Sequence, residues 1–88
     1  MDDHDTIIEI RRPVEFTIDG RTYQTLVRWQ PAQDLLLLAG LNPEIYHLGE
    51  LRRLRPWPVR YANDEIVRIH RLARFVTIPD RVDARDAR

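Results

Sequence analysis

The clearest pattern in the chain is an alternation of apolar and polar residues, first over residues 14–18 and again over residues 21–29. A period of two is typical of half-buried strands. An Asp-Gly pair separates the two runs, and this pair is favoured in two-residue type I′ turns. Such a turn would place Phe16 opposite Tyr23 on one face, so the turn and the pattern agree. The sequence therefore predicts an antiparallel β-hairpin.

A helix is predicted after the hairpin, starting at about Pro31, because proline is favoured at the first helical position. The run Leu35–Leu38 leaves little helix surface for water and predicts a helix that a curved sheet buries on most sides. Gly40 is the expected residue with positive φ after the helix end, and Leu41 is expected to fold back on the last turn. Pro43 then prevents the helix from resuming.

Shorter apolar runs follow the helix. Residues 45–48 and 59–61 predict short strands on either side of a loop that contains Pro56-Trp57-Pro58. Residues 66–72 alternate well enough for a last, central strand, and apolar residues continue as far as Pro79. The predicted fold is of the α+β class: a mixed sheet of four to five strands packed on one helix, with the first and last strands as central neighbours. That is the β-grasp, or ubiquitin-like, arrangement.

Length and composition indicate one small globular domain. The 88 residues are too few for two independent cores, and 43% hydrophobic and 32% charged residues are ordinary for a soluble protein. We divide the chain into a flexible N-terminal segment or strand extension at 1–12, the domain at 13–79, and a flexible charged tail at 80–88. No apolar run approaches the roughly 20 residues that span a bilayer, the N-terminus is acidic, and there is no cysteine. We expect a cytoplasmic protein with no membrane association.

The charge pattern is unusual in one respect. The net charge is zero, and all 14 basic residues are arginine, because the chain has no lysine. A net charge of zero argues against a general nucleic-acid binder. The absence of lysine has two interpretations, a genome that favours arginine codons or a protein with no side-chain amine to be acylated.

Five short segments, taken together in this order and spacing, resemble the bacterial multiubiquitin-type domain, a prokaryotic ubiquitin-like family. They are Ile18–Tyr23, Leu38–Pro43, Tyr46–Leu48, Asn63–Val67 and Arg74–Thr77. The resemblance covers roughly residues 14–78 and implies a β-grasp fold. It also implies partners that resemble an E1-like activating enzyme, an E2-like carrier and a deubiquitinase-like peptidase, in some operons for antiphage defence.

The resemblance implies a ubiquitin-like modifier whose C-terminal carboxylate is activated with ATP as an acyl-adenylate and then transferred. Ubiquitin-like tails usually end in diglycine, whereas the three glycines of this chain are all internal. We therefore expect no diglycine conjugation. Conjugation would require an E1-like enzyme that accepts another terminal residue, either without trimming or after proteolysis within residues 77–88. The alternative is a β-grasp adaptor that docks partners and is never conjugated.

No catalytic site, cofactor or metal is predicted. The chain has no cysteine nucleophile and no glycine-rich phosphate loop, and its three histidines lack the spacing of metal ligands. We therefore expect a protein that is not an enzyme.

The candidate functional residues are instead arginines and one tryptophan that could bind partners: Arg52, Arg53, Trp57, Arg60, Arg71 and Arg74. The region expected to carry processing or conjugation is Phe75, Val76, Thr77, Ile78 and Pro79. Arg71 and Arg74, interpreted as lying next to the tail, would suit an acidic groove on an activating enzyme. Arginines interleaved with aromatic residues are also typical of single-strand nucleic-acid surfaces. The neutral net charge favours a protein–protein interface, since Arg, Trp and Tyr are enriched there.

Overall fold

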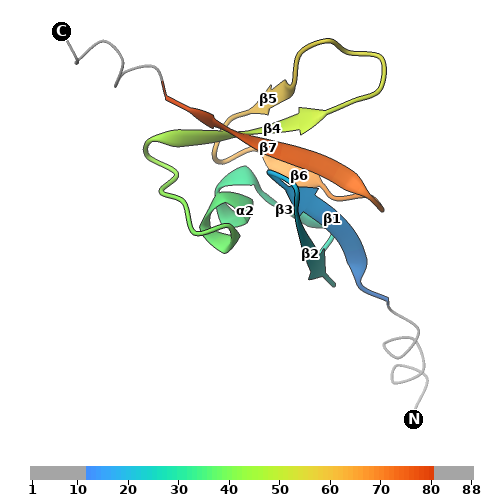
Figure 1. Cartoon of the computed structure of the whole chain (residues 1–88). Coiled ribbons are helices and arrows are strands. Elements are labelled where there is room, and N and C mark those ends of the chain that lie inside the picture. Colours follow the sequence, from blue (N-terminus) through green and yellow to red (C-terminus); the bar gives the residue numbers. More distant parts are fainter. Residues whose placement is uncertain (1–11, 81–88) are drawn as a thin grey trace, which may run out of the picture.

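A computed structural model describes residues 12–80 (Figure 1), so the predicted terminal segments lie outside the described residues except for Arg12 and Asp80. The elements are β1 Val14–Ile18, β2 Arg21–Thr25, β3 Trp29–Pro31, α2 Ala32–Leu38, β4 Tyr46–Leu51, β5 Val59–Tyr61, β6 Ile66–Arg68 and β7 Ala73–Pro79. Five strands form a mixed sheet in the order β2-β1-β7-β4-β5, and β3 and β6 form a separate two-stranded ladder.

The described part of the chain has the predicted α+β composition, with one helix and a mixed five-stranded sheet. The first and last strands are central neighbours, as predicted. They pair in parallel, with Phe16 opposite Ala73 and Ile18 opposite Phe75. The arrangement is consistent with a β-grasp-like fold.

The hairpin has the predicted register, with Phe16 opposite Tyr23. Asp19 and Gly20 have φ of 51° and 82°, the positive values that a type I′ turn requires at both central residues. The Asp19 carboxylate also accepts hydrogen bonds from the Thr77 backbone N–H at 3.0 Å and the Thr77 hydroxyl at 2.6 Å. The turn is therefore fastened to the last part of β7.

The helix ends as predicted, in a Schellman motif. The N–H of Gly40 donates to the Leu37 carbonyl and the N–H of Leu41 to the Leu36 carbonyl, both at 2.9 Å, and Gly40 has a φ of 83°.

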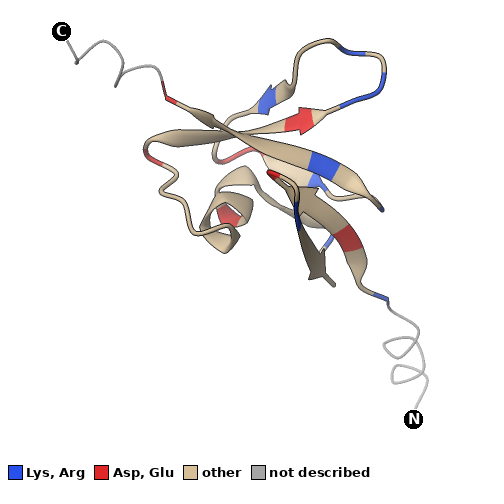
Figure 2. Cartoon of the chain, viewed as in Figure 1, with Lys and Arg blue, Asp and Glu red and all other residues tan. Residues whose placement is uncertain are grey.

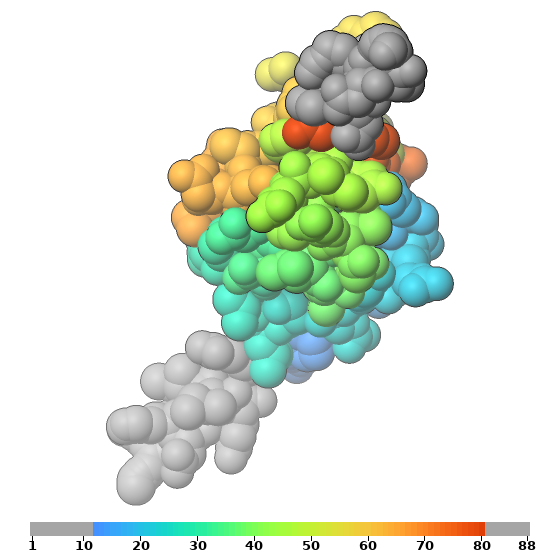
Figure 3. All heavy atoms as spheres, turned by 90° about the vertical axis from the view of Figure 1, so that its left-hand side faces the viewer, coloured from blue at the N-terminus to red at the C-terminus, as the bar shows by residue number. Residues whose placement is uncertain are grey.

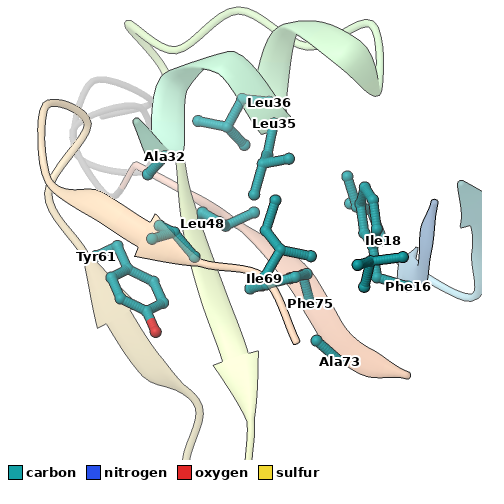
Figure 4. Packing of buried hydrophobic residues seen from close by; sticks show 12 residues of the cluster. Phe16, Ile18, Ala32, Leu35, Leu36, Leu48, Tyr61, Ile69, Ala73 and Phe75 are labelled. Carbon is teal, nitrogen blue, oxygen red and sulfur yellow. The ribbon is translucent and has the colours of Figure 1, made fainter. Parts of the chain in front are cut away.

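The prediction that the helix is buried on most sides is wrong. Leu35 and Leu36 are completely buried, but Leu37 and Leu38 are 59% and 50% exposed. The reason is that the sheet covers one face of α2, and Figure 4 shows Leu35 and Leu36 on the side toward the sheet. The four leucines are therefore divided between core and surface.

The predicted final strand over residues 66–72 is also wrong. β6 ends at Arg68 and pairs with β3, and β7 starts only at Ala73. Between them a turn forms, in which the Ala73 N–H donates to the His70 carbonyl at 3.0 Å and Leu72 has a φ of 62°. The central strand is therefore β7, which pairs with β1 on one side and β4 on the other.

The core lies between α2 and the sheet and also receives Val67 and Ile69 from the β6 segment (Figure 4). At its centre Phe16 meets Phe75 edge to face, with ring centroids 5.9 Å apart.

The segment after α2 closes one flank of the core. In Figure 3 this yellow-green segment lies between the blue residues of the hairpin and the orange residues around β6. Asn63 donates from Nδ2 to the Pro43 carbonyl at 2.6 Å, and the Asp80 N–H donates to the Ile45 carbonyl at 2.8 Å. The chain thus remains attached to the domain through Asp80. The one helix in residues 12–80, α2, is not long and apolar enough to cross a membrane.

Candidate functional site

The candidate site is an open groove of about 660 Å³ at the end of the sheet where β4 stops and β7 starts. β4 and β7 are antiparallel, and their last pair at this end is Leu51 opposite Arg74. The pairing therefore brings together two segments about 20 residues apart in sequence. Four of the six predicted partner-binding residues line the groove: Arg52, Arg53, Arg71 and Arg74. Figure 2 shows their blue segments near the end of β4 and the start of β7.

The other two predicted residues do not line the groove. Arg60 on β5 lies beside β4, where its Nη2 is 3.0 Å from Nδ1 of His47. Trp57 is 78% exposed in the loop between β4 and β5. The structure therefore separates the six candidates into a groove of four arginines and two residues elsewhere on β5 and its preceding loop.

Glu50 is the one buried charged side chain in residues 12–80, with 1% of its surface exposed. The Tyr61 hydroxyl donates to its Oε1 at 2.6 Å, and Arg52 Nη2 donates to the same oxygen at 3.1 Å. Arg52 Nη2 also lies 3.0 Å from the Tyr61 hydroxyl oxygen, and Nε2 of His70 lies 3.0 Å from Glu50 Oε2. Three partners from three segments thus meet a single carboxylate at the edge of the groove.

The sequence prediction missed Glu50. Glu50 lies two residues after Leu48, and residues two apart in a strand point to the same face. A strand that places Leu48 in the core and continues to Leu51 therefore also points Glu50 toward the core. The prediction ended this strand at residue 48, so the glutamate stood outside it.

Two groups in this cluster have raised pKa values, which determine their protonation at neutral pH. Burial raises the pKa of Tyr61 above its ordinary value of 10.0, and the hydrogen bond to Glu50 raises it further. The hydrogen bond to Glu50 and then the one to Tyr61 raise the pKa of Arg52 above an already high value. At neutral pH the phenol is therefore a donor and the guanidinium is charged. The cluster has the features of a structural support for the groove wall, because none of the groups is an activated nucleophile.

We expect the stability of the domain to fall above about pH 10 through Tyr61. A pKa that folding raises contributes stability below the unfolded value, and this contribution is lost as pH rises through the folded value. The physical cause is that phenolate formation would place a second negative charge beside Glu50. The chain has no lysine or cysteine, so neither an ammonium nor a thiol side chain contributes to this pH dependence.

The measurement is urea unfolding of wild type and Tyr61→Phe at pH 8 and pH 11. At pH 8 the variant should be less stable by about 1.5–3 kcal/mol, the contribution of one hydrogen bond to a charged group. At pH 11 the difference should shrink. An unchanged difference would show that Tyr61 is not the titrating group.

The residues predicted to form the processing region have a different place in the structure. Phe75–Pro79 belong to β7 rather than to a tail beyond the sheet, and Phe75 is 1% exposed. They lie in the strand because β1 and β4 pair with it on both sides, with Pro79 opposite Tyr46 as the last pair. Proteolysis inside this range would cut the central strand. Their role in conjugation stays a prediction, but the residue that is joined to a target would have to follow them.

The expectation that Arg71 and Arg74 lie next to the tail is wrong. Arg74 is the second residue of β7 and Pro79 the last. At about 3.3 Å per residue, the two are separated by roughly 17 Å along the strand. The arginine groove and the C-terminal end of β7 therefore lie at opposite ends of the sheet.

Residues 12–80 contain no group of three or more histidine, aspartate or glutamate side chains that could hold a metal ion. Comparisons with known protein families, with curated proteins and with solved structures find no match for this chain. The resemblance to the multiubiquitin-type family therefore stays a prediction.

Proposed function

We propose that this chain is a β-grasp, ubiquitin-like modifier of a bacterial conjugation pathway in the cytoplasm. In this proposal an E1-like enzyme activates its C-terminal carboxylate with ATP, an E2-like enzyme carries it, and a deubiquitinase-like peptidase removes it. The supporting observation is the sheet order β2-β1-β7-β4-β5, with a parallel central pair and one helix between β2 and β4 in the described chain. That order is the one expected of a β-grasp domain.

The end of β7 supports the same proposal. The chain leaves the sheet directly from its central strand, whose last residues are held by Asp19 and by the Asp80–Ile45 hydrogen bond. In a modifier the domain docks on the enzyme and a segment that leaves it enters the active site. A rigid starting point for this segment helps to position the reacting carboxylate, which lowers the entropic cost of the reaction. On this proposal the transferred carboxylate belongs to a residue after Asp80.

The proposal is tested with two N-terminally tagged chains produced in the native cells, one full-length and one ending at Asp80. The full-length chain should yield covalent adducts that survive denaturation, detected as added intact mass. The chain ending at Asp80 should remain folded and yield none. Full-length protein without any adduct, or equal adducts from both chains, would contradict the proposal.

The second candidate is an adaptor that binds partners without conjugation. Two observations favour it: the residues after Asp80 contain no glycine, and the arginine groove lies at the opposite end of β7 from Pro79. An adaptor ending at Asp80 should keep its partner binding, whereas a modifier ending there should lose its activity. The same pair of chains therefore separates the two functions.

A further inference from the structure

The groove carries more positive charge than its own walls neutralise. Within residues 12–80, Arg53, Arg71 and Arg74 have no carboxylate partner. The one acidic side chain in the lining, Glu50, is already engaged by two basic side chains. A chain with a net charge of zero thus concentrates unpaired guanidinium groups at one end of its sheet.

Leu72 at the same groove has an unusual backbone. Its φ is 62°, in the left-handed region that disfavours branched and bulky side chains, and its side chain is 61% exposed. Its N–H donates to the Glu15 carbonyl at 2.7 Å, which holds the turn in place. Glycine would adopt this conformation without strain, and the exposed leucine gains little from burial within the domain. An observed outlier of this kind points to a function for the side chain.

The charged and apolar features lie side by side. The lining of the groove combines its arginines with Leu51, Leu72 and Ala73. A ligand that satisfied both would carry several negative charges next to an apolar group. Guanidinium groups bind carboxylates through paired, planar hydrogen bonds, which add geometric specificity to the attraction.

We propose that this groove binds an acidic linear segment of a partner protein, in which carboxylates flank a large apolar residue. The carboxylates would pair with Arg53, Arg71 and Arg74, and the apolar residue would contact Leu72. Arg52 would keep its ion pair with Glu50 and so stabilise the wall of the groove. This binding would serve a modifier and an adaptor alike, so the proposal stands or falls independently of conjugation.

A peptide fits the groove better than a nucleic acid does. Sequence-tolerant binding of single strands relies on aromatic side chains on which bases stack. No aromatic residue lines this groove among the described residues, and the exposed Trp57 lies outside the lining. The groove therefore has positive charges that would attract phosphates, but its described lining has no aromatic side chain on which a base could stack.

The test is fluorescence anisotropy with a labelled synthetic peptide, Asp-Glu-Glu-Leu-Asp-Glu, and the full-length chain at low salt. We expect saturable binding that the double variant Arg71→Glu/Arg74→Glu weakens at least tenfold. Both side chains are exposed and unpaired, so the variant should fold, which circular dichroism would verify. Arg21→Glu is the matched control, because Arg21 is also exposed and unpaired but lies on β2, outside the groove. It should change binding less than twofold.

Two further probes define what would overturn the proposal. The same peptide with Asn and Gln in place of its acidic residues should not bind. A labelled eight-nucleotide thymidine strand should bind more weakly than the acidic peptide. Equal binding of the neutral peptide, tighter binding of the nucleotide strand, no binding of the acidic peptide, or an equal loss with Arg21→Glu would each overturn it.

Leu72→Gly tests the apolar part separately. Glycine relieves the strained φ, so the urea midpoint of unfolding should rise, while the probe should bind about threefold more weakly. A chain that gains stability and keeps full affinity would overturn the role of Leu72 in the groove.

Discussion

Replacing Phe75 with alanine is expected to lower the free energy of unfolding by about 3–5 kcal/mol, the range for large aromatic side chains in cores. Phe75 is 1% exposed and lies in β7 between β1 and β4, where its ring packs on that of Phe16. A domain of this size has a total stability on the order of 5 kcal/mol. The variant should therefore retain at most about 2 kcal/mol of stability and unfold at a much lower urea concentration than the wild type.

Trp57→Ala is the matched control for this prediction. It also removes a large aromatic side chain, but one that is 78% exposed, so its effect should stay within about 0.5 kcal/mol. Urea unfolding followed by far-ultraviolet circular dichroism measures both variants without relying on tryptophan fluorescence. Similar losses in the two would contradict the placement of β7 at the centre of the sheet.

A chain that ends at Val76 is expected to lose most of its stability, whereas a chain that ends at Asp80 should keep it. The shorter chain lacks Thr77–Pro79, which pair with Tyr46–Leu48, and it leaves the Asp19 carboxylate without its two donors. Loss of about three ladder hydrogen bonds and two charge-assisted bonds would cost roughly 5–10 kcal/mol. That is comparable with the whole stability of the domain.

The measurement compares urea midpoints of the full chain and the two truncated chains. The chain ending at Asp80 should stay within about 1 kcal/mol of the full chain, because it retains every described pair of β7 and the Asp80–Ile45 hydrogen bond. A chain ending at Val76 that unfolds like the full chain would show that Thr77–Pro79 contribute little to stability, contrary to their pairing in β7.

Local features of the fold were predictable because neighbouring residues determine them. The Asp19-Gly20 turn fixes the hairpin register, and Gly40 with Leu41 fixes the end of α2. In both cases the conformation depends on a few residues adjacent in sequence. The division of Leu35–Leu38 between core and surface depends instead on how much of α2 the sheet covers, which no local pattern encodes.

The last strand shows why a pattern can predict the wrong boundary. Val67, Ile69, Ala73 and Phe75 are all buried at odd positions, so the buried residues keep the same parity on both sides of the turn at 70–73, and only the exposed Arg71 interrupts the alternation. The buried residues on the two sides of the turn belong to two different segments, the one around β6 and β7, which pair in separate sheets. The partner strands β3 and β1, distant in sequence, determine where one ends and the next begins.

The candidate groove was predictable in composition but not in arrangement. Arginine type and clustering identified the four groove residues, whereas the antiparallel pairing of β4 and β7 brought the two clusters together. The same pairing placed them far from the end of β7, which the sequence order of Arg71, Arg74 and Pro79 did not suggest. To predict that Glu50 is buried, one would have needed to know how far β4 extends.

The most direct test of the proposed modifier is to map the linkage in any adduct recovered from native cells. Tryptic digestion followed by mass spectrometry should find a target peptide with a branch. The branch should contain residues of this chain that follow Asp80, joined through their terminal carboxyl group to a target amine. Because arginines recur after Asp80, the branch should be only a few residues long. Adducts without such a branch, or linked through another part of the chain, would contradict the account.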